Sequence, residues 1–207
     1  MGQLIACATT EGVFLASDSR SVFFEPDGEE RFIEVDRLVP ISPQVILASA
    51  GALEAHDLAK DFADFARGDN LTEIDALIDA AIPYFTGRYD DITRKMCEKL
   101  PLDPVINMYL LLAGYSLKTP DQPSRLFIIW DRAKPPKIEY NRVTKIFTLP
   151  RRMGLEFKLN QLVSQKTHLY QVAAAARAGL EKLASQDLLI GPPFHYLTIT
   201  AGGVSKV

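Results

Sequence analysis

The apolar residues of the first fifty positions fall in short runs separated by turn residues, a pattern typical of β-strands. Residues 3–9 and 12–17 form the first two runs, and Thr10, Glu11 and Gly12 between them predict a tight hairpin turn. In the charged segment 21–36, Pro26-Asp27-Gly28 predicts a second turn flanked by two short strands. Residues 37–42 and 45–50 then predict two buried strands, the second of which ends at Gly51.

The apolar period changes at Leu53, where it becomes that of an amphipathic helix. A second helix is predicted to begin near Thr72, whose hydroxyl can cap it together with Asp75 three residues later. Pro83 is expected to kink this helix rather than to end it, because helix-forming residues continue to about Leu100.

The second half of the chain alternates in the same way between strands and helices. Strands are predicted at 107–113, 125–130, 138–148 and 195–200, and helices at 155–164 and 168–185. Because strands and helices are segregated along the chain, we expect an α+β fold in which two mostly antiparallel sheets pack together and helices lie outside them.

Composition and charge narrow the class of protein. With 207 residues, of which 47% are apolar and 24% charged, the chain is expected to form a single domain over residues 1–207. Its net charge is −3 and its basic residues are scattered, which argues against a nucleic-acid partner. No apolar run approaches the roughly 18 residues that a membrane span needs, so no membrane partner is expected.

The cysteines and histidines give no sign of a metal or a cofactor. Cys7 and Cys97 lack the paired spacing of metal sites or disulfide frameworks, which is typical of a cytoplasmic protein. His56, His168 and His195 fall in three different predicted elements, so we expect no metal site.

Three short motifs carry a resemblance to a known family. They are GVFLASDSR at Gly12–Arg20, RLVPIS at Arg37–Ser42 with Ala50-Gly51 after the next strand, and Asp187 followed four residues later by Gly191. In order and spacing they resemble proteasome β-type subunits, members of the N-terminal-nucleophile hydrolase superfamily, over nearly the whole chain. The resemblance implies a four-layered αββα sandwich that assembles into homo-oligomeric rings.

The resemblance also implies where catalysis would occur. In that family an N-terminal threonine attacks the peptide carbonyl while its own α-amine accepts the proton. A lysine keeps the local field positive, a backbone N–H of a glycine stabilises the oxyanion, and a serine and an aspartate orient the amine. Carried over by position, the nucleophile falls on Gly2, the lysine on Arg37, the acidic residues on Asp18 and Asp187, and the oxyanion donor on Gly51.

This sequence departs from the family at the reactive positions. Gly2 has no side chain with which to attack, and the guanidinium of Arg37 stays protonated and cannot relay a proton. The segment 149–154 contains no serine to orient an amine. We therefore expect a non-proteolytic or atypical subunit that acts as a self-assembling ring or scaffold component. Asp18 and Arg37 are expected to form a structural ion pair in preference to a vestigial catalytic one.

Alternatives remain for the same residues. Cleavage after Ala8 would expose Thr9 as the nucleophile of a threonine peptidase or amidohydrolase, although Thr9 also suits a turn. The former cleft could instead bind a peptide or a small molecule. Asp187 could terminate its helix and hold the loop that leads to Gly191, and Arg151-Arg152 is expected to be a solvated loop.

Overall fold

The structure is a computed structural model that describes residues 2–24, 29–99, 108–133 and 136–207. The turn expected at Pro26-Asp27-Gly28 and the first residue of the strand expected at 107–113 lie outside the described residues. In the described part of the chain, no helix is both long enough and apolar enough to cross a membrane.

The first sheet brings the N-terminal hairpin beside the C-terminal one. Its strand order is β10-β1-β2-β11-β12, and every neighbouring pair is antiparallel. Its strands are β1 (Leu4–Ala8), β2 (Val13–Ser17), β10 (Ile146–Leu149), β11 (His195–Thr200) and β12 (Gly203–Lys206). The predicted hairpin is confirmed, since Leu4 pairs with Ser17 and Ala8 with Val13.

The second sheet follows the order of the chain. It runs β5-β6-β7-β8-β9, again with antiparallel neighbours, and a separate two-stranded ribbon joins β3 to β4. These strands are β3 (Arg20–Phe24), β4 (Glu30–Glu34), β5 (Leu38–Ser42), β6 (Val45–Gly51), β7 (Met108–Tyr115), β8 (Ser124–Ala133) and β9 (Pro136–Val143).

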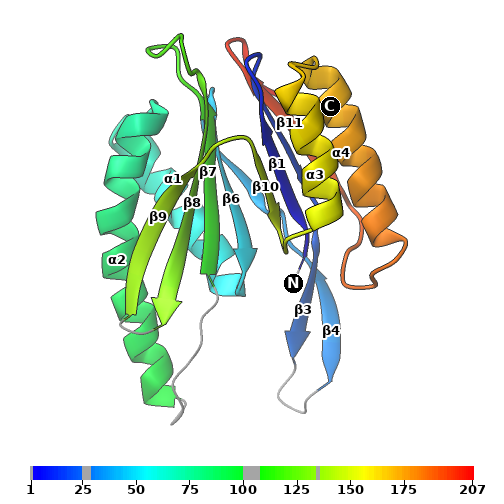
Figure 1. Cartoon of the computed structure of the whole chain (residues 1–207). Coiled ribbons are helices and arrows are strands. Elements are labelled where there is room, and N and C mark those ends of the chain that lie inside the picture. Colours follow the sequence, from blue (N-terminus) through cyan, green and yellow to red (C-terminus); the bar gives the residue numbers. More distant parts are fainter. Residues whose placement is uncertain (1, 25–28, 100–107, 134–135) are drawn as a thin grey trace.

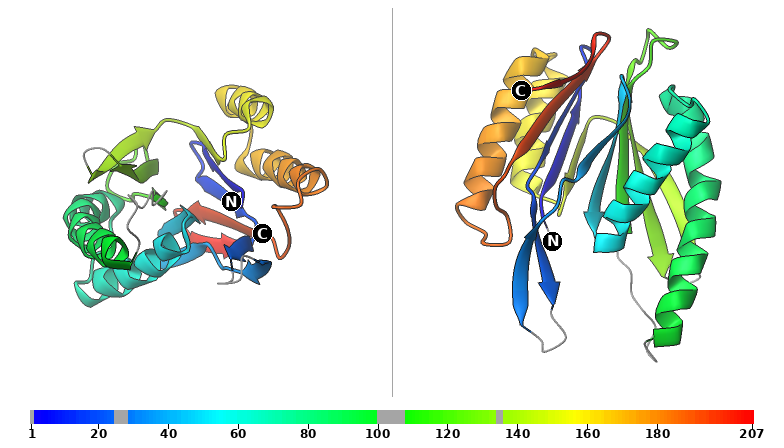
Figure 2. Two further views of the ribbon diagram at one scale, coloured as in Figure 1. Left: turned by 90° about the horizontal axis from the view of Figure 1, so that it is seen from below. Right: turned by 180° about the vertical axis from the view of Figure 1, so that it is seen from behind.

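A pair of helices covers the outer face of each sheet. The helices are α1 (Leu53–Gly68), α2 (Ile74–Lys99), α3 (Met153–Ser164) and α4 (Leu169–Ala184). Apolar residues of α1 and α2 share a core with the second sheet, and those of α3 and α4 share another with the first sheet. A third core, which includes Leu15, Ala48 and Leu111, lies between the sheets. Figures 1 and 2 show the two helix pairs on opposite sides of the molecule. The fold is therefore mixed α and β with antiparallel sheets, as the segregated pattern predicted.

Two predictions about strands in the second half were wrong or incomplete. The run 138–148 is not one strand, because β9 ends at Val143 and β10 begins at Ile146 in the other sheet. β12 was not predicted, since Gly203 and three mixed residues give little strand signal. By contrast, α2 continues through Pro83, as expected.

Candidate functional site

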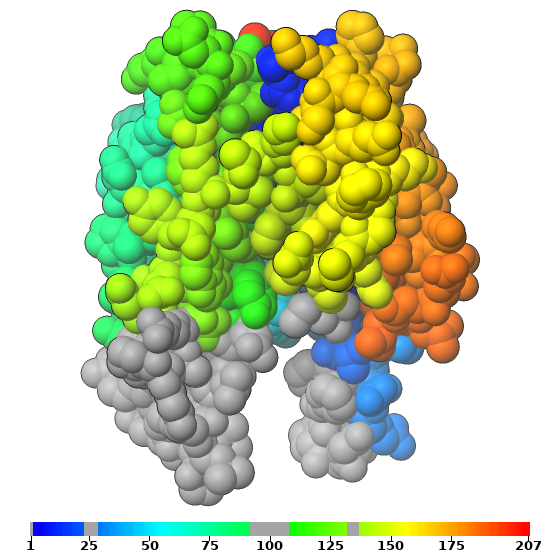
Figure 3. Space-filling view, in the orientation of Figure 1, coloured from blue at the N-terminus to red at the C-terminus, as the bar shows by residue number. Residues whose placement is uncertain are grey.

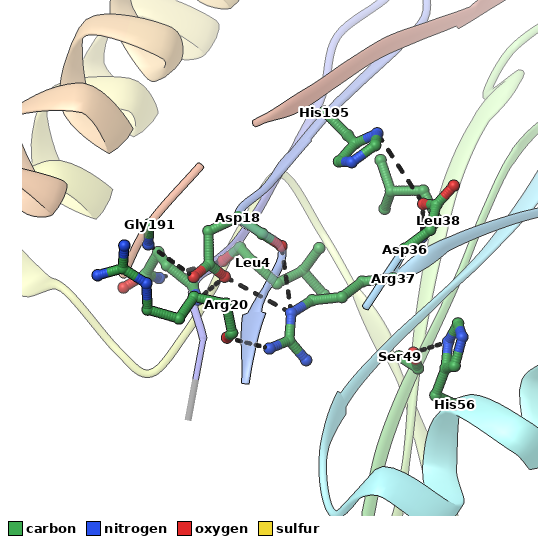
Figure 4. Close-up of polar contacts among 11 residues, drawn as sticks. Leu4, Asp18, Arg20, Asp36, Arg37, Leu38, Ser49, His56, Gly191 and His195 are labelled. Carbon is green, nitrogen blue, oxygen red and sulfur yellow. Dashed lines mark hydrogen bonds and ion pairs between the residues drawn. The ribbon is translucent and has the colours of Figure 1, made fainter. Parts of the chain in front are cut away.

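Asp18 lies directly after β2 and is fully buried. One carboxylate oxygen, Oδ1, accepts the backbone N–H of Gln3 at 2.7 Å, and Oδ2 accepts that of Gly191 at 3.1 Å. Figure 4 shows this carboxylate beside Gly191, Arg20 and Arg37. Asp18 thus joins the segment that enters β1 to the loop that precedes β11.

Arg37 completes the cluster from the other sheet, where it immediately precedes β5. Its side chain is only 4% exposed, and its Nε lies 3.5 Å from Asp18 Oδ1. The same Nε donates to the backbone carbonyl of Asp18 at 3.2 Å, and Nη2 donates to that of Arg20 at 2.7 Å. The expected pairing of Asp18 with Arg37 is confirmed, and it links the two sheets.

Burial dominates the electrostatics of this pair. Desolvation raises the pKa of the Asp18 carboxyl, whereas the positive charge of Arg37 and the backbone N–H groups that donate to the carboxylate lower that pKa and compensate in part. Desolvation also lowers the pKa of the Arg37 guanidinium, although the Asp18 charge acts in the opposite sense. Both charged forms are therefore less favourable here than in water, and each depends on the other for compensation.

Gly2 lies in direct reach of this pair and is buried. A Cβ atom built on Gly2 would lie 2.5 Å from Arg37 Nη2 and closer still to Asp18 Oδ1. Both distances are shorter than van der Waals contact, so the space that a side chain would need is occupied by the ion pair. The structure thus brings together three of the residues selected from the sequence, namely Gly2, Asp18 and Arg37.

Asp187 is connected to this cluster through Arg152 and Gln3, neither of which was predicted from the sequence to be a site residue. Its Oδ2 accepts from Arg152 Nη2 at 2.8 Å, and Arg152 Nε donates to the side-chain oxygen of Gln3 at 2.9 Å. Gln3 is fully buried, and its amide donates to the carbonyl of Pro150 at 3.1 Å. The Arg152 hydrogen bond lowers the pKa of the Asp187 carboxyl. Arg152 lies in the segment 149–154, where the resemblance implies an orienting serine.

The prediction for Arg151-Arg152 was therefore half wrong. Arg151 is exposed, although it pairs with Glu156 at 2.8 Å. Arg152 is about two-thirds buried and tied to Asp187. Asp187 does hold its loop, as expected, because its Oδ1 accepts the N–H of Leu189 and its carbonyl accepts that of Ile190.

The other two selected residues lie outside this network. Gly51 ends β6 opposite Met108 and has a φ of 91°, so it occupies a backbone conformation that favours glycine. Thr9 follows β1 at the end opposite Gln3. Its hydroxyl donates to the carbonyl of Gly12 at 3.0 Å and accepts the N–H groups of Glu11 and Gly12. The interpretation of Thr9 as a turn residue is confirmed.

Ser49 and His56 form a second polar pair that was not predicted from the sequence. Ser49 Oγ lies 3.4 Å from His56 Nδ1, and the Ser49 N–H donates to the Arg37 carbonyl at 2.9 Å. The side chains are 1% and 7% exposed, which shields them from a substrate. Burial is the largest cause that lowers the pKa of His56, so its imidazole is neutral at pH 7.

The thiol of Cys7 is expected to be unreactive in the folded protein. It is fully buried among apolar residues, and desolvation raises its pKa to about 12. We expect no iodoacetamide adduct on Cys7 in the folded protein at pH 8, and full modification after unfolding in guanidinium. Mass spectrometry of the peptide that contains Cys7 measures both states. Rapid alkylation of the folded protein would show that the thiol is reachable and ionised.

Within the described ranges, no three histidine, cysteine or acidic side chains are grouped so that they could hold a metal ion. The site is instead a buried ion pair with peptide N–H donors around it and a filled position at Gly2. No protein-family model matches this chain, and no curated protein matches it in sequence.

Proposed function

We propose that this protein is a proteasome-type subunit of the N-terminal-nucleophile hydrolase fold that does not cleave peptides and acts as a self-assembling scaffold or ring component. The observation that carries the proposal is the crowding at Gly2. The motif spacing assigns the nucleophile to this position, and Asp18 and Arg37 occupy the space that any nucleophilic side chain would need.

The chemistry of the remaining residues supports the same conclusion. Both Asp18 oxygens accept backbone N–H groups, and Arg37 donates to two backbone carbonyls. In the resembled family the proton acceptor is the α-amine of the nucleophile, so the resemblance gives Asp18 no proton to remove. These side chains are committed to holding segments of backbone together, which is a structural task.

The order of the layers supports the fold part of the proposal. The apolar cores that each helix pair shares with one sheet, together with the core between the sheets, support a four-layered αββα arrangement. β2 pairs with β11, and Asp18 of the Gly12–Arg20 motif accepts the backbone N–H of Gly191. This contact between two of the three motifs supports the proposed fold.

Exposed apolar side chains support the assembly part. Met153 and Phe157 lie one helical turn apart on α3 and are 77% and 75% exposed. Figure 3 shows α3, coloured yellow, at the surface. Large exposed apolar groups that lie side by side are typical of protein interfaces.

The peptidase alternative that begins at Thr9 has less support. Cleavage after Ala8 would remove β1, which pairs with both β2 and β10 and supplies Ile5 and Cys7 to one core and Leu4 and Ala6 to another. The first sheet would lose one of its central strands.

Three measurements on protein purified from its native cell test the proposal. We expect an intact mass that retains β1, no covalent adduct after incubation with a proteasome-type β-lactone, and an oligomer in multi-angle light scattering at micromolar concentration. A species that begins at Thr9 and is labelled by the lactone would overturn the non-proteolytic part. A monomer would overturn the assembly part.

A further inference from the structure

We propose that copies of this chain associate head to tail, with the basic face of α3 and α4 in one copy against the acidic face of α1 in the next. This inference rests on the proposed self-assembly and specifies its contact. It follows from three observations, namely the charges of the two helix pairs, a groove between α3 and α4, and the position of the helix pairs on opposite sides.

The first face is basic around an apolar groove. This groove, of about 640 Å³ between α3 and α4, is lined by Arg151, Arg152, Lys158 and Lys182 and by no acidic side chain of the described residues. Its apolar lining includes Leu155, Ala175, Ala178, Gly179 and Leu183. Two of the cations are already paired, Arg151 with Glu156 and Arg152 with Asp187. Lys158 and Lys182 have no ion-pair partner among the described residues, and both are exposed.

The opposite helix pair is strongly acidic. Residues 53–91 contain ten acidic and three basic residues, whereas residues 151–187 contain three acidic and six basic ones. Asp57, Asp61 and Asp64 are all exposed and follow one another at spacings of four and three residues, so they line one face of α1. Asp64 is paired with Arg67 at 3.1 Å, and Asp57 and Asp61 have no ion-pair partner among the described residues. Beside them the ring of Phe65, which is 37% exposed, stacks on Tyr84.

These charges favour one mode of contact over the alternatives. Two basic faces, or two acidic faces, would repel each other, whereas the basic face of one copy attracts the acidic face of another. Because the two faces lie on opposite sides of the molecule (Figure 1), such a contact joins different surfaces and leaves one of each free. Contacts of this heterologous kind continue until they close into a ring or extend as a filament.

Apolar groups on both faces complement the charges. Phe65 follows Asp61 by four residues and so lies beside it on α1, whereas Phe157 lies on α3 beside Met153, which lines the groove. Each face therefore combines an exposed aromatic ring with charged neighbours, and this combination is typical of interfaces that exclude water at their centre and keep charges at their rim.

A charge exchange between the faces tests the contact. The first variant is Lys158→Glu/Lys182→Glu, and the second is Asp57→Lys/Asp61→Lys. We expect wild-type protein to be oligomeric by light scattering at micromolar concentration and to shift toward monomer as salt rises, because salt screens exposed charges. Each variant alone is expected to be at least tenfold weaker in association than wild type. An equimolar mixture of the two is expected to regain assembly, because every acidic face again meets a basic one.

A matched control carries the same change of charge elsewhere. Lys118→Glu/Lys206→Glu alters two exposed lysines outside both helix pairs and is expected to assemble like wild type. Circular dichroism of each variant verifies that it is folded. If wild type is oligomeric but the face variants assemble normally, or if the mixture fails to assemble, this contact is overturned while self-assembly stands. A monomeric wild type would overturn both.

Discussion

Replacement of Asp18 by alanine is expected to lower the free energy of unfolding by about 3–5 kcal/mol, because it leaves the buried Arg37 guanidinium without its counter-charge. The backbone N–H groups of Gln3 and Gly191 also lose their acceptor, since both donate to the Asp18 carboxylate. Denaturation in urea, followed by circular dichroism at pH 7, measures the change through a shift in midpoint at constant slope.

Two further variants distinguish the effect of breaking the Asp18–Arg37 ion pair from the effect of removing a carboxylate elsewhere. Glu181→Ala breaks an exposed pair with Arg177 and is expected to cost no more than about 1 kcal/mol. Combining Asp18→Ala with Arg37→Met is expected to cost about 2 kcal/mol less than the sum of the two single changes, since neither charge is then left alone. Additive effects would show that Asp18 and Arg37 do not stabilise each other.

Introducing the missing nucleophile through Gly2→Thr is expected to destabilise the protein by about 1–3 kcal/mol without giving peptidase activity. The new Cβ would collide with Asp18 Oδ1 and Arg37 Nη2, so the ion pair must move or the N-terminal segment must withdraw. Urea denaturation measures the loss of stability, and β-lactone labelling with a fluorogenic peptide assay measures reactivity.

The same substitution at an open glycine provides the control. A Cβ at Gly154 meets no atom within 4 Å, so Gly154→Thr is expected to change stability by no more than about 0.5 kcal/mol. A Gly2→Thr protein as stable as wild type that also became labelled by the lactone would contradict the proposed function, because the site would then accept and activate a nucleophile.

Most elements of the fold could be predicted because they rest on local patterns. The short apolar runs predicted as β1 and β2, and the helical periods predicted as α1 and α4, agree with the structure within a few residues. The break between β9 and β10 could not be predicted, because the sequence around Thr144 and Lys145 has no glycine or proline. The two strands are separate because β10 pairs with β1, which lies far away in the sequence.

The site could be predicted in part for the same reason. Asp18 and Arg37 belong to motifs, so their pairing was foreseen from the resemblance. Gln3 and Arg152 belong to no motif. They meet because β10 pairs with β1 and is followed directly by the segment that carries Arg152 into α3. The one signal in the sequence is a glutamine at the start of the apolar run 3–9, since an amide that is buried with such a run needs hydrogen-bond partners.

The position of β1 between β2 and β10 has a consequence for how the chain folds. Leu4 pairs with Leu149, so one edge of β1 is paired only after a segment 145 residues later in the chain has joined the sheet. Until then its hydrogen-bonding edge stays open, and pairings between residues so distant in sequence form slowly. An unpaired strand edge is a template for association with other chains. Refolding yield should therefore fall as protein concentration rises, and β1 and β10 should be among the last segments to gain protection from hydrogen exchange.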